Sequence, residues 1–223
     1  MNGFIRLESA GKAAPCGGQA LCDVSFSVEA GEWAEVAGPV GSGKTALIRL
    51  IAGMERPDGG RVFVAGRAVH EMNEGEAAAF RSGAVGVCLR DPALPPFLPL
   101  WENAALPLAV RRVPTAERKR RAGEALRELG IAYAAQALPD ALSPYERKLG
   151  ALARALAAGP PILLLDEFTA DLPQAEAARL ADLTRSLAQA KRLTVVCCVS
   201  RRSDCGAGRR FKMEYGRITE ENR

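Results

Sequence analysis

The stretch Gly38–Thr45, GPVGSGKT, constrains this chain more than any other feature of its sequence. It matches the pattern G-x-x-x-x-G-K-[ST] at every fixed position, between a strand-like segment, WAEVA, and a helical one, ALIRLIAGM. Glycines let the backbone wrap closely, so that successive N–H groups face phosphate oxygens, and the following helix adds its positive end. A glycine-rich turn with a chance lysine is the alternative, but motif and context agree. The stretch therefore predicts a binding site for the phosphates of a nucleotide.

Two side chains of this stretch have expected roles of their own. Lys44 is expected to reach the outer phosphates as a point charge, and the Thr45 hydroxyl to bind Mg²⁺. The residues predicted to contact the nucleotide here are Gly38, Pro39, Val40, Gly41, Ser42, Gly43, Lys44, Thr45 and Ala46.

A second part of the site is predicted at ILLLDE, residues 162–167. Four apolar residues indicate a buried strand that ends at Asp166. An aspartate at the carboxyl end of a parallel strand faces the ligand crevice, so Asp166 is expected to hold Mg²⁺, directly or through water. Glu167 is placed to orient and polarise an attacking water. The alternative, an acidic turn after a core strand, is disfavoured because a phosphate loop lies upstream.

The pattern of elements indicates an α/β fold. Short strand signals fill the first 70 residues or so, and DVSFSVEA alternates as a half-buried antiparallel strand should. Buried strands are expected at 84–89, in ILLLDE and in LTVVCCV, with a last short strand near RRFKMEYG. Helices are expected over 46–54, 115–130, 143–158 and 173–190, and a Pro-rich connector over 91–108.

These elements predict a P-loop NTPase core with a mainly parallel sheet, an N-terminal antiparallel β subdomain and an α-helical subdomain. Residues 1–223 are expected to form a single domain, with the helical subdomain at approximately 91–158.

Composition excludes several other classes. The net charge of +4 is mild, and the basic run at 118–121 fits a solvated helix face better than a nucleic-acid contact. None of the six cysteines has zinc-site or thioredoxin spacing, and the two in TVVCCVS fit a buried strand. No secretory leader is recognisable in residues 1–20, and no apolar run reaches the roughly 18 residues that cross a bilayer. A cytosolic protein is expected, whose membrane part, if any, belongs to another chain.

Taken in order, these segments resemble the nucleotide-binding subunits of ABC transporters. The similarity runs over almost the whole chain, through the phosphate loop, LPLWENAALPL, ALARALAAGPPILLLDE, TADL and EYGRI. LWENAALPL followed by ERKRRAGEALRELGI looks most like the branch that serves lipoprotein release, macrolide export and cell division. The resemblance implies an ATPase that uses ATP and Mg²⁺ and acts as a dimer, with each ATP held between one subunit's phosphate loop and the other's signature segment.

The family's signature reads Leu-Ser-Gly-Gly-Gln, and the matching residues here are Leu142-Ser143-Pro144-Tyr145-Glu146. The resemblance implies that Ser143 contacts the γ-phosphate across the dimer. Pro144 has no N–H to offer, and Tyr145 places a large ring where close approach is needed. Ser143, Pro144 and Glu146 nevertheless suit a capped helix start. We therefore expect the helix to be kept and its grip on phosphate to be weakened.

Other positions also depart from the family. Arg90 stands where the family has a glutamine, and this cation would either repel the metal or pair with a phosphate. Ser200 and Arg201 are the candidates for the position of the family's switch histidine, and the chain's one histidine lies far upstream. Pro173 takes the place of an aspartate, and the segment 11–14 has no aromatic residue to stack on adenine.

Three hypotheses follow. The first is an ATP-binding subunit that couples ATP binding and hydrolysis by Glu167, fast or slow, to a separate transmembrane permease. The second is a catalytically weak, regulatory nucleotide-binding partner in a heterodimer with a complete ABC ATPase. The third is another P-loop protein, such as a small GTPase or a nucleotide kinase. The segment ALARALAAGPPILLLDE opposes it, as does the lack of an Asn-Lys-x-Asp guanine-reading motif.

The expected partners are the permease and a second ATPase subunit, in a homodimer or a heterodimer, with no nucleic acid. The chain is expected on the inner face of the cell membrane, held there by the permease. Trp101 and the prolines of PPFLPLW would either line the permease's docking groove or pack locally.

Overall fold

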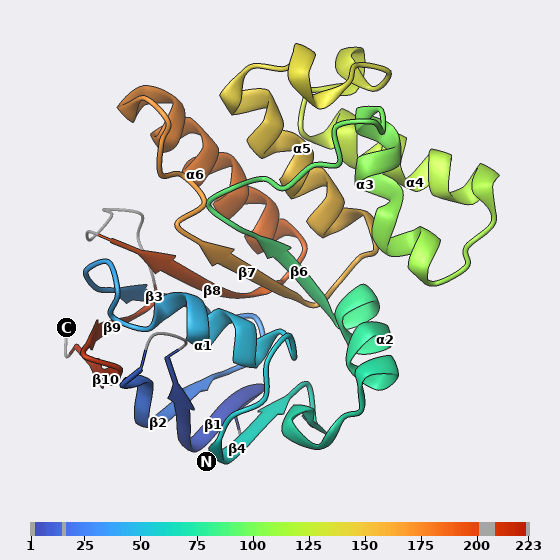
Figure 1. Ribbon diagram of the computed structural model, residues 1–223. Coiled ribbons are helices and arrows are strands. Elements are labelled where there is room, and N and C mark those ends of the chain that lie inside the picture. Colours follow the sequence, from blue (N-terminus) through green and yellow to red (C-terminus); the bar gives the residue numbers. More distant parts are fainter. Residues whose placement is uncertain (1–2, 15–16, 201–207, 222–223) are drawn as a thin grey trace.

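The computed structural model describes residues 3–14, 17–200 and 208–221, and these form two sheets with helices between and around them (Figure 1). The first sheet is antiparallel, in the order β2-β1-β4-β5. Its strands are β1 (Ile5–Ala13), β2 (Gln19–Val28), β4 (Gly59–Val64) and β5 (Arg67–Ala68). The second sheet has the order β10-β9-β3-β8-β7-β6, and all its pairs are parallel except β10 with β9. Its strands are β3 (Trp33–Ala37), β6 (Val85–Cys88), β7 (Ile162–Asp166), β8 (Thr194–Val199), β9 (Arg209–Glu214) and β10 (Arg217–Glu220).

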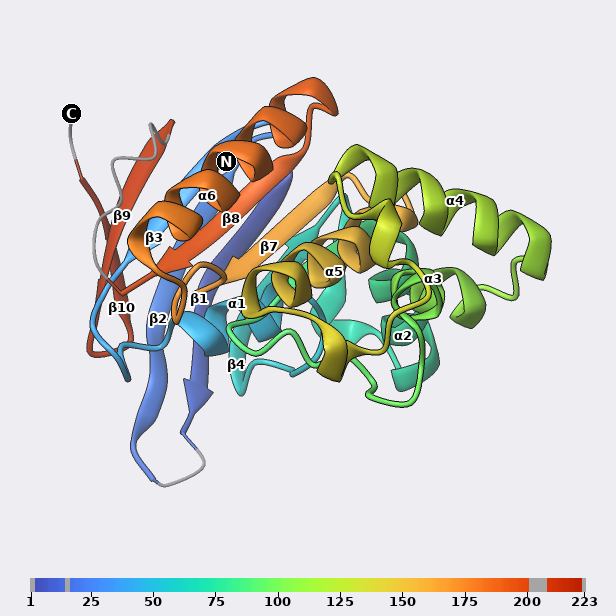
Figure 2. The same ribbon diagram turned by 90° about the horizontal axis from the view of Figure 1, so that it is seen from above.

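The helices cover both faces of the parallel sheet. One helix, α1, lies between the two sheets, while α5 and α6 cover the opposite face (Figure 1). Seen from above, α3, α4 and α5 gather at one end of the molecule, away from β9 and β10 (Figure 2). The helices are α1 (Lys44–Ile51), α2 (Glu74–Ala84), α3 (Leu100–Val110), α4 (Thr115–Glu128), α5 (Pro144–Ala157) and α6 (Gln174–Ala190), with short 3₁₀ turns at Val69–Glu71, Ala132–Ala134 and Pro139–Ala141. The predicted α/β class, with an antiparallel β part and a mainly parallel core sheet, is confirmed.

Strand β7 shows why the core sheet needs cover on both faces. Ile162 and Leu164 belong to the core shared with α1, whereas Leu163 and Leu165 belong to the core under α5 and α6. Successive side chains of a strand point to opposite faces, so a strand buried on both sides is apolar throughout. Asp166 ends this run, at the carboxyl end of the strand and beside the start of α1.

The predicted connector over 91–108 is wrong in its second half, because α3 occupies Leu100–Val110. Its prolines concealed a helical pattern: Leu100, Ala104 and Leu108 recur at four-residue spacing and are fully buried. Pro99 precedes the first helical residue, and Pro107 lies inside the helix. Asn103 connects the start of α3 to the preceding segment, since its amide donates to the Leu98 carbonyl at 2.8 Å. Helix α2, which opens with a capping box at Asn73, was also not predicted.

The other predicted helices are present, with ends shifted by at most three residues; α1, for example, starts at Lys44 instead of Ala46. Of the two adjacent cysteines in β8, Cys198 is fully buried but Cys197 is only partly buried, which corrects the expectation that both are core residues. Within the described ranges, no helix has the length and apolar character to span a bilayer.

Candidate nucleotide-binding site

The loop from Gly38 to Gly43 joins β3 to α1, and two of its glycines could not carry a side chain. A Cβ on Gly38 would lie 2.1 Å from the Met213 carbonyl oxygen, and one on Gly43 would lie 2.3 Å from that of Ala20. Gly43 also has a φ of 109°, which non-glycine residues rarely adopt. The loop can therefore pack this tightly only with glycine at these positions, which agrees with the sequence pattern.

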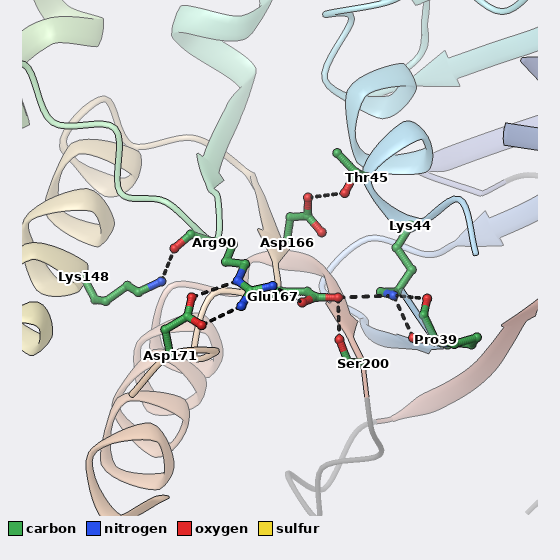
Figure 3. Close-up of polar contacts among 10 residues, drawn as sticks. Pro39, Lys44, Thr45, Arg90, Lys148, Asp166, Glu167, Asp171 and Ser200 are labelled. Atoms are coloured by element: carbon green, nitrogen blue, oxygen red, sulfur yellow. Dashed lines mark hydrogen bonds and ion pairs between the residues drawn. The ribbon is translucent and has the colours of Figure 1, made fainter. Parts of the chain in front are cut away.

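Lys44, the first residue of α1, is buried in the centre of this loop. Its Nζ donates to the carbonyl oxygens of Gly38 at 2.7 Å and Pro39 at 2.8 Å. It also lies 3.3 Å from Oε1 of Glu167. The lysine thus joins the loop to the acidic end of β7, and its charge is aimed at the space between them (Figure 3).

Thr45 and Asp166 form the second link between α1 and β7. The Thr45 hydroxyl donates to Oδ2 of Asp166 at 2.8 Å, while Oδ1 of Asp166 is buried with no hydrogen-bond partner in the described structure. Burial raises the pKa of Asp166, and the Thr45 hydrogen bond and the Lys44 charge oppose that rise only in part. A buried carboxylate oxygen without a partner beside a hydroxyl is a donor set that suits Mg²⁺. The residues present therefore fit the metal expected here.

Glu167 follows directly, and one hydroxyl and two cations surround its carboxylate. Oε1 accepts from the Ser200 hydroxyl at 2.5 Å and faces Lys44, and Oε2 lies 3.7 Å from a guanidinium nitrogen of Arg90. Burial alone would raise the pKa of Glu167, but these hydrogen bonds and charges outweigh it, and the pKa is lowered. Because its pKa is lowered, the carboxylate is ionised at neutral pH, and because the side chain is only 13% exposed, it is partly shielded from solvent.

Arg90 lies at the edge of the site, after β6, and its main partner is Asp171. Nε donates to Oδ2 at 2.8 Å and Nη2 to Oδ1 at 2.6 Å, so the pair is bidentate (Figure 3). This hydrogen-bonded guanidinium lowers the pKa of Asp171. Asp171 lies in the TADL segment, but the sequence predicts no role for its side chain, because its partner Arg90 is 81 residues away.

A cavity of about 700 Å³ opens in front of these groups. Residues of the phosphate loop, Arg90, Asp166 and Glu167 line one part of it, and the end of the β1–β2 hairpin lines another. The hairpin contributes Lys12, Ala13, Ala14 and Ala20. None of the described lining residues is aromatic, as expected from segment 11–14. Within the predicted set, Val40, Gly41, Gly43, Lys44, Thr45, Ala46, Arg90, Asp166 and Glu167 thus meet in one cavity.

Ser143 does not reach this cavity. It lines a separate hollow with Tyr133, Tyr145 and Glu146. Ser143 caps α5 in a capping box with Glu146, and Pro144 is the first helical residue, as expected. The ring of Tyr145 is partly buried against the core and has the Arg179 guanidinium 5.6 Å from its centre, so it is folded back onto α6. Within Leu142–Glu146, Ser143 and Pro144 are thus exposed and Tyr145 is partly buried.

Of the two candidates for the switch position, Ser200 is the one that the structure places beside Glu167, and Arg201 lies outside the described residues. Pro173 precedes the first residue of α6.

A buried lysine and aspartate, together with the hydroxyl of Thr45 and the partly buried Glu167, surround a glycine loop on a parallel sheet. This arrangement defines a P-loop nucleotide-binding protein. The comparison with known families is more specific. Residues 21–170 match the ABC transporter family, and the chain belongs to that family. Its members are ATP-binding cassettes with ATPase activity, which excludes the small GTPase.

Relatives with known roles agree. The chain is 40% identical to the methionine import ATP-binding protein MetN of Thermobifida fusca, over 79% of its own length and 55% of the relative's. It is 32% identical to the lipoprotein-releasing system ATP-binding protein LolD 1 of Rhodopirellula baltica, over 88% of this chain and 87% of the relative. The chain thus spans about half of MetN and most of LolD. These relatives favour an ATP-binding subunit of a transporter over the regulatory partner.

A solved structure gives the same result for the fold. The dimeric ATP-binding cassette MJ0796, in a post-hydrolysis state bound to ADP and Pi, superposes with a TM-score of 0.88 at 26% identity, covering 98% of both chains. ATP binding by this chain follows from its family.

Proposed function

We propose that this chain binds Mg-ATP in the cavity in front of the phosphate loop and hydrolyses it to drive a separate membrane subunit. The observation that carries this proposal is the convergence of Lys44, Thr45, Asp166 and Glu167 on that cavity. They come from two elements that are more than 100 residues apart in sequence, and the Thr45–Asp166 hydrogen bond holds these elements together.

The phosphate side works through charge and backbone donors. The loop's N–H groups and the start of α1 bind the phosphate oxygens, and Lys44 exchanges its loop carbonyls for the outer phosphates. Thr45 and Asp166 hold Mg²⁺, which supplies positive charge against the phosphate oxygens. Arg90, held by Asp171, adds positive charge on the rim of the same cavity.

Glu167 acts as the base. Its Oε1 now faces Lys44 and Ser200. When phosphate draws Lys44 away, this oxygen becomes able to accept a proton from a water that attacks the γ-phosphate. Ser200 still donates to the carboxylate and keeps it oriented, so it takes over part of the positioning for which the family uses a histidine.

The same proposal covers the partners. A second ATPase subunit, identical or related, would bring its signature segment to this phosphate loop, and Ser143 would serve the other site in return. Residues 1–223 act as one domain, and its helical part near 91–158 docks a permease that holds the chain on the inner face of the cell membrane. Phe97, 77% exposed, is one of the exposed apolar side chains there, whereas Trp101 is partly buried against the core beside Lys119.

The test is Glu167→Gln, which keeps the shape of the side chain and removes the base. We expect Mg-ATP to bind as in the unaltered protein and steady hydrolysis to fall by about 100-fold or more. The matched control is Glu128→Gln, at an exposed ion pair with Lys191. Equal hydrolysis in the Glu167 and control variants would remove Glu167 from the mechanism.

A further inference from the structure

Arg90 lies between two carboxylates and uses different nitrogens for each. Nε and Nη2 are both hydrogen-bonded to Asp171, and only Nη1 faces Glu167, at 3.7 Å. That separation is an ion-pair distance but too long for a hydrogen bond. The guanidinium therefore sits close enough to act on Glu167 by charge, without covering either of its oxygens.

The backbone of Arg90 is anchored independently of its side chain. The buried Lys148 of α5 donates from Nζ to the Arg90 carbonyl oxygen, and its ammonium lies 5.6 Å from the centre of the Phe168 ring. With its backbone held, Arg90 can change partners only by rotating its side chain. Asp171 and Glu167 both lie within its reach.

The Arg90–Asp171 pair is exposed, with 55% and 57% of the two side chains accessible. Exposed pairs contribute little to folding stability because water and salt screen them. A bidentate pair nevertheless fixes the plane and direction of a guanidinium. This pair therefore fixes the position of the Arg90 side chain and contributes little to the stability of the fold.

We propose that Asp171 is a positioning residue that holds Arg90 away from Glu167 and so keeps the Glu167 carboxylate open to the attacking water. Without Asp171, the guanidinium turns to the nearest remaining carboxylate, which is Glu167, and pairs with it through two nitrogens. A carboxylate covered in this way accepts no proton from water. This inference rests on the proposed role of Glu167 as the base.

The kinetic test is a double-mutant cycle on the full chain with Mg-ATP. We expect Asp171→Asn to lower kcat about tenfold, an effect typical of coupling between residues in contact. In the Arg90→Gln background, the same substitution should change kcat by less than about twofold, because the cation that it releases is gone. In either background, Asp171→Asn should leave the Kd for Mg-ATP unchanged. Equal losses from Asp171→Asn in both backgrounds, or no loss in either, would overturn the inference.

Glu117→Gln is the matched control. Arg120 and Glu117 form a bidentate pair of similar geometry and exposure on α4, and neither residue lines the nucleotide cavity. Loss of the Glu117–Arg120 pair should leave kcat unchanged. Thermal unfolding of all variants shows whether a lower kcat comes from a less stable fold or from a displaced Arg90.

A crystal structure of the Asp171→Asn variant tests the same point without turnover. We expect Arg90 within about 3 Å of Glu167 in that structure, the distance of a charge-assisted hydrogen bond. Arg90 directed into solvent would overturn the inference even if hydrolysis were lost. If Glu167→Gln leaves hydrolysis intact, the proposed function fails instead, and this structure still shows whether Asp171 restrains Arg90.

Discussion

The phosphate loop and the signature segment both lie at helix starts and both have a phosphate-binding role in this family. In this chain, packing constrains the residues of the two segments differently. At the loop, Gly38 and Gly43 lie against backbone atoms that would clash with any side chain, so local packing and ligand binding demand the same residues. At the start of α5, packing demands only a cap, and Ser143 and Glu146 provide one. Pro144 suits that cap and removes an N–H. The start of a helix can thus remain stable after it has lost a backbone N–H that could bind a phosphate.

The largest expected effect concerns the loop side. Lys44→Ala should weaken Mg-ATP binding by about 100-fold or more, because at least two charge-assisted hydrogen bonds to phosphate are lost. Isothermal titration calorimetry measures this directly. Lys191→Ala, at an exposed lysine paired with Glu128, is the control and should bind as before. Unchanged binding in the Lys44 variant would mean that the loop is not the nucleotide site.

A smaller effect is expected at the metal position. Asp166→Asn keeps the hydrogen bond from Thr45 but removes the charge, so about tenfold or more Mg²⁺ should be needed for half-maximal hydrolysis. Titration of Mg²⁺ at fixed ATP gives this value. Asp182→Asn, an exposed position on α6, should leave the titration unchanged. Equal Mg²⁺ requirements in the two variants would contradict the assignment of Asp166.

The smallest effect is a gain of affinity. Gly11 has room for a side chain, since a Cβ there would meet only the Leu21 carbonyl oxygen, at 3.8 Å. Gly11→Tyr should tighten ATP binding by about tenfold, because a ring stacked on a base contributes roughly 1–3 kcal/mol. Inorganic tripolyphosphate should bind the variant as it binds the original chain. If both ligands gain equally, the ring does not contact the base.

The sequence predicted the parts of the site that local motifs encode. The loop, Asp166 and Glu167 each follow from a short pattern next to a recognisable strand or helix, and the structure brings them to one cavity. Asp171 could not be predicted in this way, since only the folded chain brings it to Arg90. The same holds for Ser200, one of two candidates for the switch position, because only the folded chain brings its hydroxyl, directly after β8, to Glu167.

One further error has a simple physical cause. The prediction of a connector over 91–108 fails at α3, because prolines precede and interrupt a helix whose buried residues recur at helical spacing. The position of the Tyr145 ring beside Arg179 of α6 depends on tertiary contacts that a local pattern does not encode.

The contrast between the two helix starts is tested most directly by ATP-dependent dimerisation. Sedimentation velocity of the unaltered chain and of a Pro144→Gly, Tyr145→Gly variant, both carrying Glu167→Gln to prevent turnover, would be compared with and without Mg-ATP. We predict that the variant forms dimers with ATP at lower protein concentration, with most of the gain from Pro144→Gly alone. Equal dimerisation of the two proteins, with ATP bound by both, would contradict the account of the signature segment.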